Sequence, residues 1–377
     1  MSGIYIHIPF CKQACHYCDF HFSTTRKHQS RMVKAICQEL KLRKEDINSG
    51  INTIYFGGGT PSLLSKTEIN QILQTIKAYF EVNSQAEITL EANPDDLSDE
   101  YLKEIASTEI NRLSIGVQSF FEDDLKLMNR AHDATEAINS IKLAKTYFDN
   151  ISIDLIYGIP NMSIQKWEAN LAQVFEFDIP HVSCYALTVE PNTALERFIA
   201  KEVIAPVNDD LARDHYDVLQ IQMRNRGYKN YEFSNFGKPN FYSQNNLAYW
   251  TGKPYLGIGP SAHSFNGYQR SWSIKHNIKY LKAIEAKQLP LEIEHLTTTD
   301  RFNEFIMTRL RTSLGVDLNE VEAKFGLTYR AYLTDQLQPL LKDQLVSVNS
   351  NEVIHVTENN KFLTDGISAE LFKLNLE

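Results

Sequence analysis

The sequence predicts an α/β protein that contains a full or partial barrel of parallel strands, followed by a smaller α+β domain. Two observations predict this fold. Over the first 190 residues, short β-branched runs alternate with amphipathic helical stretches, and from about residue 299 the pattern becomes three helices and a hairpin. The chain has 377 residues, of which 43% are hydrophobic, and this is enough for two domains with real cores.

Six short runs in the first half have the composition of buried strands. They lie at residues 4–8, 52–56, 86–92, 111–117, 151–157 and 181–187. Helical patterns fall between them, for example at 28–47 and 65–80. Strands that alternate with helices in this way form right-handed βαβ units and a parallel sheet. In such folds the functional residues lie where the strands end.

Polar or glycine-rich residues follow these predicted strands. The first strand leads into three closely spaced cysteines, and the second ends in the sequence GGGTP at 57–61. Glu91, Gln118 and Asp154 lie within or at the ends of the third, fourth and fifth strands. Helix capping explains polar residues in the loops, but it does not explain charged and amide side chains inside β-branched runs. We therefore expect a binding site at the carboxyl ends of the strands.

The changes of pattern give the expected domain boundaries: a barrel core at 1–190, a barrel-completing region at 191–298 and a C-terminal domain at 299–377. In the middle region a helix at about 208–226 is expected to end before Gly227, a favoured residue just past a helix end. The aromatic and Asn-rich segment after it predicts further strands and ordered loops. In the last region, the runs LVSV and VIHV around NSNE predict a hairpin, so this domain resembles a winged helix.

The charge of the chain argues against binding to nucleic acid. The formal net charge is −9, and the segment 299–377 carries 8 Lys and Arg against 12 Asp and Glu. A DNA-binding domain would need a basic face, so we expect this segment to serve packing or partner contact. No stretch approaches the roughly 18 apolar residues of a membrane span, and the start of the chain lacks the features of a signal peptide. We therefore expect a cytoplasmic protein, in a compartment that keeps thiols reduced.

Three of the five cysteines lie close together, at Cys11, Cys15 and Cys18. A disulfide framework is typical of short secreted chains, and this chain is long and poor in cysteine. A structural zinc site usually has four ligands in two C-x-x-C pairs; here there is one pair, although His16 could be a fourth ligand. An iron–sulfur cluster with three thiolates and one open iron fits the number of cysteines better. The pattern favours the cluster and leaves zinc as the alternative.

Several segments together resemble the radical S-adenosylmethionine (SAM) family: YIHIPFCKQACHYCDF, FGGGTPS, EANPDD, NRLSIGVQSF…LMNRAH and IDLIYGIP. The resemblance implies that the three cysteines bind a 4Fe-4S cluster, whose open iron chelates the amine and carboxylate of SAM. It also implies a partial (β/α)6 barrel of the TIM type, with the site at the carboxyl ends of the strands. Eight further residues match positions that contact SAM in this family: Tyr5, Gly58, Gly59, Thr60, Glu91, Gln118, Arg130 and Asp154. No catalytic residue is assigned.

Within this family the chain is similar to the branch that holds oxygen-independent coproporphyrinogen oxidase and the heme chaperones related to it. The oxidase has a further Cys two residues after the third, where Phe20 stands here, and an N-terminal extension before the cluster. Both departures favour the chaperones, which bind heme and pass it to acceptors. The resemblance therefore implies heme or porphyrin and an unknown heme-acceptor protein as partners. We expect a chaperone rather than a coproporphyrinogen dehydrogenase.

The heme-binding motif of these chaperones is H-N-x-x-Y-W, and this chain has NNLAYW. Asn246, Tyr249 and Trp250 fit the motif, but Asn245 replaces its His. Imidazole is a good axial ligand for heme iron and a carboxamide is a poor one, so we expect weak heme binding or a different ligand. His263 is the nearest candidate, although a hydrogen-bonded loop histidine is the more ordinary interpretation. We also expect the substitution Asn245→His to tighten heme binding.

Overall fold

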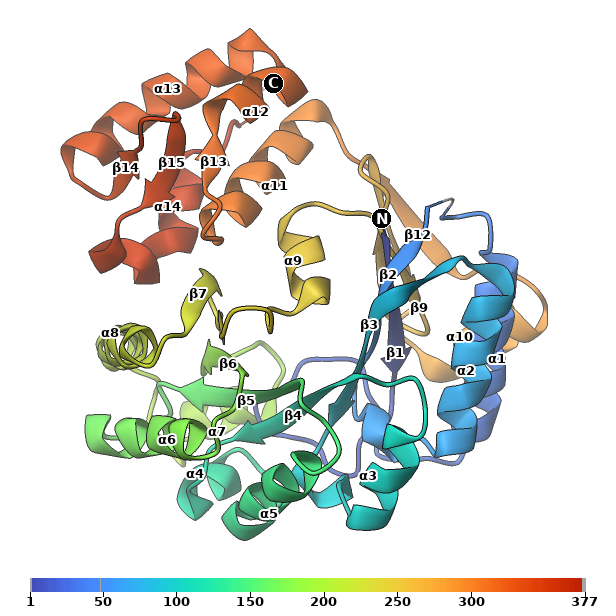
Figure 1. Cartoon of the computed structure of the whole chain (residues 1–377). Coiled ribbons are helices and arrows are strands. Elements are labelled where there is room, and N and C mark those ends of the chain that lie inside the picture. The colour runs from blue at the N-terminus through green and yellow to red at the C-terminus, as the bar shows by residue number, and fades with distance from the viewer. Residues whose placement is uncertain (1, 48, 375–377) are drawn as a thin grey trace.

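The computed structural model describes residues 2–47 and 49–374. Within these residues, twelve strands form one curved sheet in the order β12-β11-β10-β9-β1-β2-β3-β4-β5-β6-β8-β7 (Figure 1). Neighbouring strands from β1 to β6 pair in parallel. These strands are β1 Ser2–Ile8, β2 Ile51–Gly58, β3 Val82–Ala92, β4 Arg112–Gln118, β5 Ile151–Tyr157 and β6 His181–Ala186. The partial barrel is therefore confirmed, with each expected strand in its place.

Helices connect the parallel strands and cover the outer side of the sheet (Figure 1). They start at polar capping residues, as in the second helix, where the Ser65 side chain accepts from the Glu68 N–H and the Glu68 side chain accepts from the Ser65 N–H. The helices are α1 Gln29–Leu42, α2 Lys66–Tyr79, α3 Asp99–Ala106, α4 Glu122–Leu127, α5 Ala134–Ala144 and α6 Ile164–Glu176, with short 3-10 turns at Pro61–Leu63 and Pro94–Asp96.

Residues of the parallel strands alternate between an apolar outer face and a polar inner face. In β1, Ile4, Ile6 and Ile8 are buried in the core that the helices cover, whereas Tyr5 and His7 lie on the opposite face. The same alternation gives the inner face of the next strands Thr53, Tyr55 and Gly57, then Glu87, Thr89 and Glu91, then Arg112, Ser114 and Gly116, then Ser152 and Asp154. A barrel lined with polar side chains is suited to binding a ligand rather than to forming a dry core.

The region after β6 extends both edges of the sheet. The strand β9 pairs in parallel with β1, and β8 pairs antiparallel with β6. The helix α8 ends before Gly227, whose φ of +80° is the left-handed value expected there. The elements are α7 Ala194–Ala200, α8 Asp209–Asn225, β7 Lys229–Glu232, β8 Asn235–Gly237, α9 Gln244–Trp250, β9 Tyr255–Ile258, β10 His263–Phe265, β11 Gln269–Ser273, α10 Asn277–Glu285 and β12 Leu291–His295.

The C-terminal segment has its own buried core, in which Phe302, Leu333, Leu337 and Ile354 take part. The three expected helices and the expected hairpin are present, and a fourth helix follows the hairpin among the described residues. The hairpin belongs to a small sheet in the order β13-β15-β14. This segment lies on the inner side of the large sheet, beyond α9 (Figure 1). Its elements are α11 Thr298–Leu310, β13 Val316–Asp317, α12 Leu318–Phe325, α13 Leu327–Lys342, β14 Val346–Val348, β15 Val353–Val356, a 3-10 turn at Glu358–Leu363 and α14 Thr364–Glu370.

Across the described ranges of the chain, no helix combines the length and the apolar character that a membrane crossing requires.

Candidate cluster and cofactor site

The loop that carries the three cysteines is held in place by a distant segment at residues 127–130. The His16 N–H donates to the Met128 carbonyl at 3.0 Å, and His16 Nδ1 lies 2.8 Å from the Leu127 carbonyl oxygen. The amide of Asn129 donates to the Ala14 carbonyl at 2.7 Å. These bonds explain why the sequence LMNRAH accompanies the cysteine motif: it fixes the shape of the cysteine loop.

A second set of contacts holds the other side of the loop. Lys12 Nζ lies 2.7 Å from a carboxylate oxygen of Asp95 and also pairs with Asp96. The Cys11 N–H donates to the Ser23 carbonyl at 3.1 Å. Because both sides are fixed by bonds that involve no cysteine sulfur, the loop is preorganised for a metal group.

Arg130 brings a positive charge to the sulfur atoms. Its Nη1 lies 3.3 Å from Cys15 Sγ, and its Nη2 donates to the Gly116 carbonyl at 2.7 Å and to Asn93 Oδ1 at 2.8 Å. A guanidinium at this place can offset the negative charge of a metal-bound thiolate. Arg130 therefore contacts the cysteine loop, and it also matches a position that contacts SAM in the family described above.

The three thiols are free and partly exposed. Burial raises the pKa of Cys11 to about 11 and that of Cys18 to about 12, and the neighbouring thiols add to both shifts. Among the described residues, no three His, Cys, Asp or Glu side chains converge as they would on one ion. His16 is also engaged at Nδ1, by Leu127. Three thiols with this spacing suit three corners of a cluster that leaves one iron open.

The GGGTP turn packs tightly against the end of β1. The Gly59 N–H donates to the Ile8 carbonyl at 2.9 Å and the Thr60 N–H to the Phe10 carbonyl at 2.7 Å. A Cβ atom at Gly59 would lie 2.6 Å from the Phe10 carbonyl oxygen, so only glycine fits there. Since these N–H groups are already bonded within the protein, contacts from this turn to a cofactor would come from carbonyl oxygens or the Thr60 hydroxyl.

Two carboxyl groups lie inside the barrel. Glu91 accepts hydrogen bonds from the Tyr55 hydroxyl at 2.8 Å and from the Gly58 N–H at 3.2 Å. Burial raises the pKa of Glu91 to about 7, and the negative charge of Asp154 contributes to the shift. Burial also raises the pKa of Asp154 to about 6, although Ser183 and Arg112 oppose the change. Both groups can therefore exchange hydrogen bonds with the hydroxyl and amino groups of a ligand near neutral pH.

The raised pKa of Glu91 predicts how the stability of the ligand-free chain depends on pH. Between the ordinary value of 4.5 and about 7, the folded chain keeps a proton that the unfolded chain has released. Stability should therefore fall as pH rises through this window, by at most about 3 kcal/mol from this group. The substitution Glu91→Gln should remove this fall, and urea unfolding at a series of pH values measures it. Glu168→Gln, at an exposed position on α6, is the matched control and should leave the slope unchanged.

Tyr5 and Gln118 occupy the ends of this group of side chains. The Tyr5 ring stacks on Tyr55 with centroids 6.2 Å apart, and its hydroxyl lies 3.2 Å from His7 Nδ1. Gln118 is buried and has a φ of +67°, an unusual backbone conformation for a residue with a side chain. The eight residues expected to contact SAM lie on two parts of the barrel. Tyr5 and Asp154 lie mid-strand on the inner face of β1 and β5, and the other six lie near the carboxyl ends of β2 to β4 or in the loops that follow them: Gly58, Gly59, Thr60, Glu91, Gln118 and Arg130.

The NNLAYW segment forms most of α9, whose N-terminus is fixed to the inner face of the sheet. Glu87 accepts from the Gln244 N–H at 3.0 Å and from the Asn245 N–H at 3.1 Å. The Asn245 side chain is 4% exposed, and its Oδ1 accepts from the Thr53 hydroxyl at 3.2 Å. Asn245 therefore lies against the sheet. Glu87 was not expected, although a charged residue within a β-branched run is a signal that could have found it.

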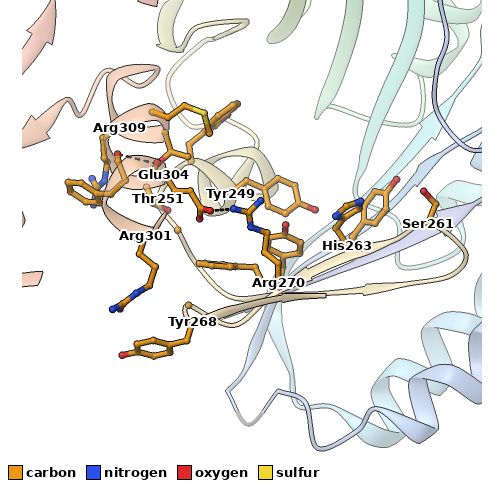
Figure 2. Close-up of a pocket in the computed structure, with 18 of the residues that line it drawn as sticks. Tyr249, Thr251, Ser261, His263, Tyr268, Arg270, Arg301, Glu304 and Arg309 are labelled. Carbon is orange, nitrogen blue, oxygen red and sulfur yellow. Dashed lines mark hydrogen bonds and ion pairs between the residues drawn. The ribbon is translucent and has the colours of Figure 1, made fainter. Parts of the chain in front are cut away.

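A cavity of about 960 Å³, the interdomain cavity, lies between the barrel, α9 and the C-terminal segment (Figure 2). Tyr249 and Trp250 line it, but Asn245 does not. Its other lining residues come from β1, from the cysteine loop, from the segment that holds β9 to β11, and from α11 and α12. Those with aromatic or imidazole rings are Tyr5, His7, Phe20, His21, Tyr255, His263, Phe265, Tyr268, Phe305 and Phe325. Most of this wall had no signal in the sequence, because it joins segments that are far apart in the chain.

Comparisons with known proteins agree with this geometry. Residues 5–174 match the family model of the radical SAM superfamily, and residues 296–363 match that of the HemN C-terminal domain. The heme chaperone HemW of Lactococcus lactis is 32% identical over 97% of this chain and 98% of that protein, and the HemW of Bacillus subtilis is 32% identical over 96% and 97%. The solved structure of coproporphyrinogen III oxidase (HemN) from Escherichia coli, a radical SAM enzyme, superposes with a TM-score of 0.85 at 25% identity, covering 98% of this chain and 90% of that one.

Proposed function

Because the chain belongs to the HemW family of the radical SAM superfamily, we propose that it is a heme chaperone that binds heme and transfers it to an acceptor protein. It carries a 4Fe-4S cluster and binds SAM exchangeably. This function requires a site for a large, flat, mostly apolar molecule that also bears two carboxylates, and a route by which that molecule can leave.

The observation that carries the proposal is the interdomain cavity. Its volume of about 960 Å³ is in the range of small-molecule sites, about 300–1,000 Å³, and most of its exposed wall is apolar. Phe20, Tyr268 and Met307 on this wall keep 67%, 66% and 38% of their surface exposed. Large apolar side chains left exposed around a cavity favour an apolar guest, and an open rim permits its transfer.

The cysteine loop fits the cluster that the family implies. Cys11, Cys15 and Cys18 would hold it, and the bound cluster supplies the electron for reductive cleavage of SAM. Arg130 offsets the negative charge of the thiolates. Glu91 and Asp154 accept hydrogen bonds from the hydroxyl and amino groups of the bound nucleoside. Tyr5 lines the interdomain cavity and lies near Glu91, so the two sites share this side chain as a wall.

A second candidate function is the oxidation of coproporphyrinogen, which the likeness to HemN favours. Against it, the position where the oxidase has a further Cys holds Phe20, an exposed ring at the rim of the interdomain cavity. A phenyl ring cannot bind metal or transfer a proton. It can cover the face of a porphyrin.

Heme titration of the anaerobically reconstituted protein tests the proposal. We expect stoichiometric heme binding, seen as a Soret band. When a heme-free globin is added, that band should be replaced by the Soret band of the heme-loaded globin, because the cavity has an open rim. In a parallel sample we expect no vinyl product from coproporphyrinogen with SAM and a reductant. A chain that forms vinyl groups and binds no heme would establish the oxidase instead.

A further inference from the structure

We propose that His263 is the axial ligand of heme iron in this chain, a role that its sequence motif no longer provides. This inference rests on the proposed function, since it concerns the same bound heme. Imidazole nitrogen is the common protein ligand of heme iron, and the nitrogen must be free of other partners to bind the metal.

Three imidazoles line the interdomain cavity, and they differ in how many nitrogens are free. Both nitrogens of His7 are engaged: Nδ1 lies 3.2 Å from the Tyr5 hydroxyl and Nε2 lies 2.8 Å from the His21 carbonyl oxygen. His21 has Nε2 engaged, 2.7 Å from Asn277 Oδ1. Neither nitrogen of His263 has a hydrogen-bond partner among the residues that the structure describes. His263 is thus the imidazole with both nitrogens available.

The surroundings of His263 hold its ring in place without using its nitrogens. It is the first residue of β10, paired in register with Trp272 of β11, and the two rings stack with centroids 5.8 Å apart. A Cβ atom at Gly257 would lie 2.0 Å from the His263 carbonyl oxygen, so β9 approaches this backbone as closely as glycine allows.

The charge of the cavity fits a guest with carboxylates. Its charged lining consists of five cations and two anions: Arg270, Lys275, Arg301, Arg309 and Lys324, against Asp19 and Glu304. This balance contrasts with the net charge of −9 of the whole chain. No carboxylate among the described residues pairs with Lys275 or Arg301, so both can bind propionate groups.

The two ends of the cavity differ in chemistry. His263 and Ser261 lie at one end, and Arg301 and Tyr268 at the other, with Tyr249 and Arg270 between them (Figure 2). The Arg301 guanidinium lies 4.9 Å from the centroid of the Tyr268 ring. A porphyrin ligated at the imidazole end could therefore extend toward the arginine end, where its carboxylates find a cation.

Asn245 cannot take this role. Its side chain is bonded to Thr53 against the sheet, so it is behind the cavity wall that Tyr249 forms. This arrangement also changes the expectation for Asn245→His: a ring placed there would replace the bond to Thr53 in a buried space, and it should not tighten heme binding. The two expectations differ because the motif gives the residue type but not the direction of its side chain.

The test is heme titration of the full-length protein with single substitutions, read by affinity and by the position of the Soret band. His263→Ala should weaken heme binding by at least about tenfold and shift the spectrum to that of a weakly ligated heme. Free imidazole should restore the spectrum. His263→Met should give a different spectrum, that of a thioether ligand. His295→Ala, an exposed imidazole of β12 outside the cavity, is the matched control and should match the unsubstituted chain.

The outcomes separate this proposal from the proposed function. If the unsubstituted chain binds heme and His263→Ala leaves both affinity and spectrum unchanged, the ligand assignment is wrong while the chaperone function stands. The ligand assignment would also be overturned if His21→Ala, and not His263→Ala, weakened heme binding and changed the spectrum. Tighter heme binding by Asn245→His would overturn it as well. If the unsubstituted chain binds no heme at all, the proposed function itself fails.

Discussion

Cys11→Ala, Cys15→Ala and Cys18→Ala should each abolish the 4Fe-4S cluster, which is the largest expected effect of any substitution in this chain. The anaerobically reconstituted chain should contain about four irons and four sulfides, and each variant should contain close to none. The reason is that three thiolates are the fewest that hold such a cluster with one open iron. Iron and sulfide analysis, with the visible absorbance of the cluster, measures the result.

The structure provides a matched control for this experiment. Cys37 lies on α1, with its Sγ 3.8 Å from the Gln71 carbonyl oxygen and away from the cysteine loop. Cys37→Ala should therefore keep its full content of iron and sulfide. The loop variants should still fold, because the bonds that hold the loop involve no cysteine sulfur. The His16 N–H donates to the Met128 carbonyl, and the Asn129 amide donates to the Ala14 carbonyl. One zinc per chain in place of iron, or a loop variant that keeps its cluster, would contradict the assignment.

The barrel could be predicted from the sequence because its signals are local. Each strand is a short β-branched run, and a polar side chain inside such a run has few structural explanations. This is why Glu91 and Asp154 could be selected in advance, and in the structure both lie inside the barrel. The cysteine spacing is a local signal of the same kind.

The interdomain cavity could not be predicted, because it depends on how distant segments come together. The cavity brings Phe20 together with His263 and Arg301, which both lie more than 200 residues later in the chain. The periodicity of a single helix or strand does not indicate such neighbours. The side chain of Asn245 gives a second example. Its motif places it in a heme site, yet packing of α9 on Glu87 turns it toward Thr53. Helix docking, which sequence patterns do not encode, decides the direction.

The wall that carries His263 depends on a buried ion pair, and this gives the second large prediction. Glu39 and Arg43 of α1 are 0% and 3% exposed, with Nη1 3.3 Å from Oε1. Arg43 also donates to the Gly257 carbonyl at 2.8 Å and to the Ser264 hydroxyl at 3.1 Å, so it ties β9 and β10 to the helix layer. On the other oxygen, Glu39 accepts from the Tyr280 hydroxyl at 2.6 Å.

Arg43→Met should destabilise the fold by about 3–5 kcal/mol, because it leaves the Glu39 carboxylate buried without its partner. The loss should be smaller at pH 5 than at pH 8: burial already raises the pKa of Glu39, and without Arg43 this carboxyl can avoid the cost by taking a proton. Urea unfolding at the two pH values measures both effects. Heme affinity should fall as well, since β10 loses its anchor.

Arg31→Met is the matched control, because it removes an arginine from the same helix. The Arg31–Glu285 pair is exposed, at 39% and 49%, with Nε 2.5 Å from Oε1. Solvent and salt screen an exposed pair, so this variant should lose little stability and no heme affinity. If both variants lost equally little stability, the buried Glu39–Arg43 pair would not be what holds β9 and β10 against the helix layer. Arg43→Met could instead lose stability and bind heme with unchanged affinity. That result would refute the link between the Arg43 bonds and the cavity, because a β10 strand without these bonds should not hold His263 in place for the iron.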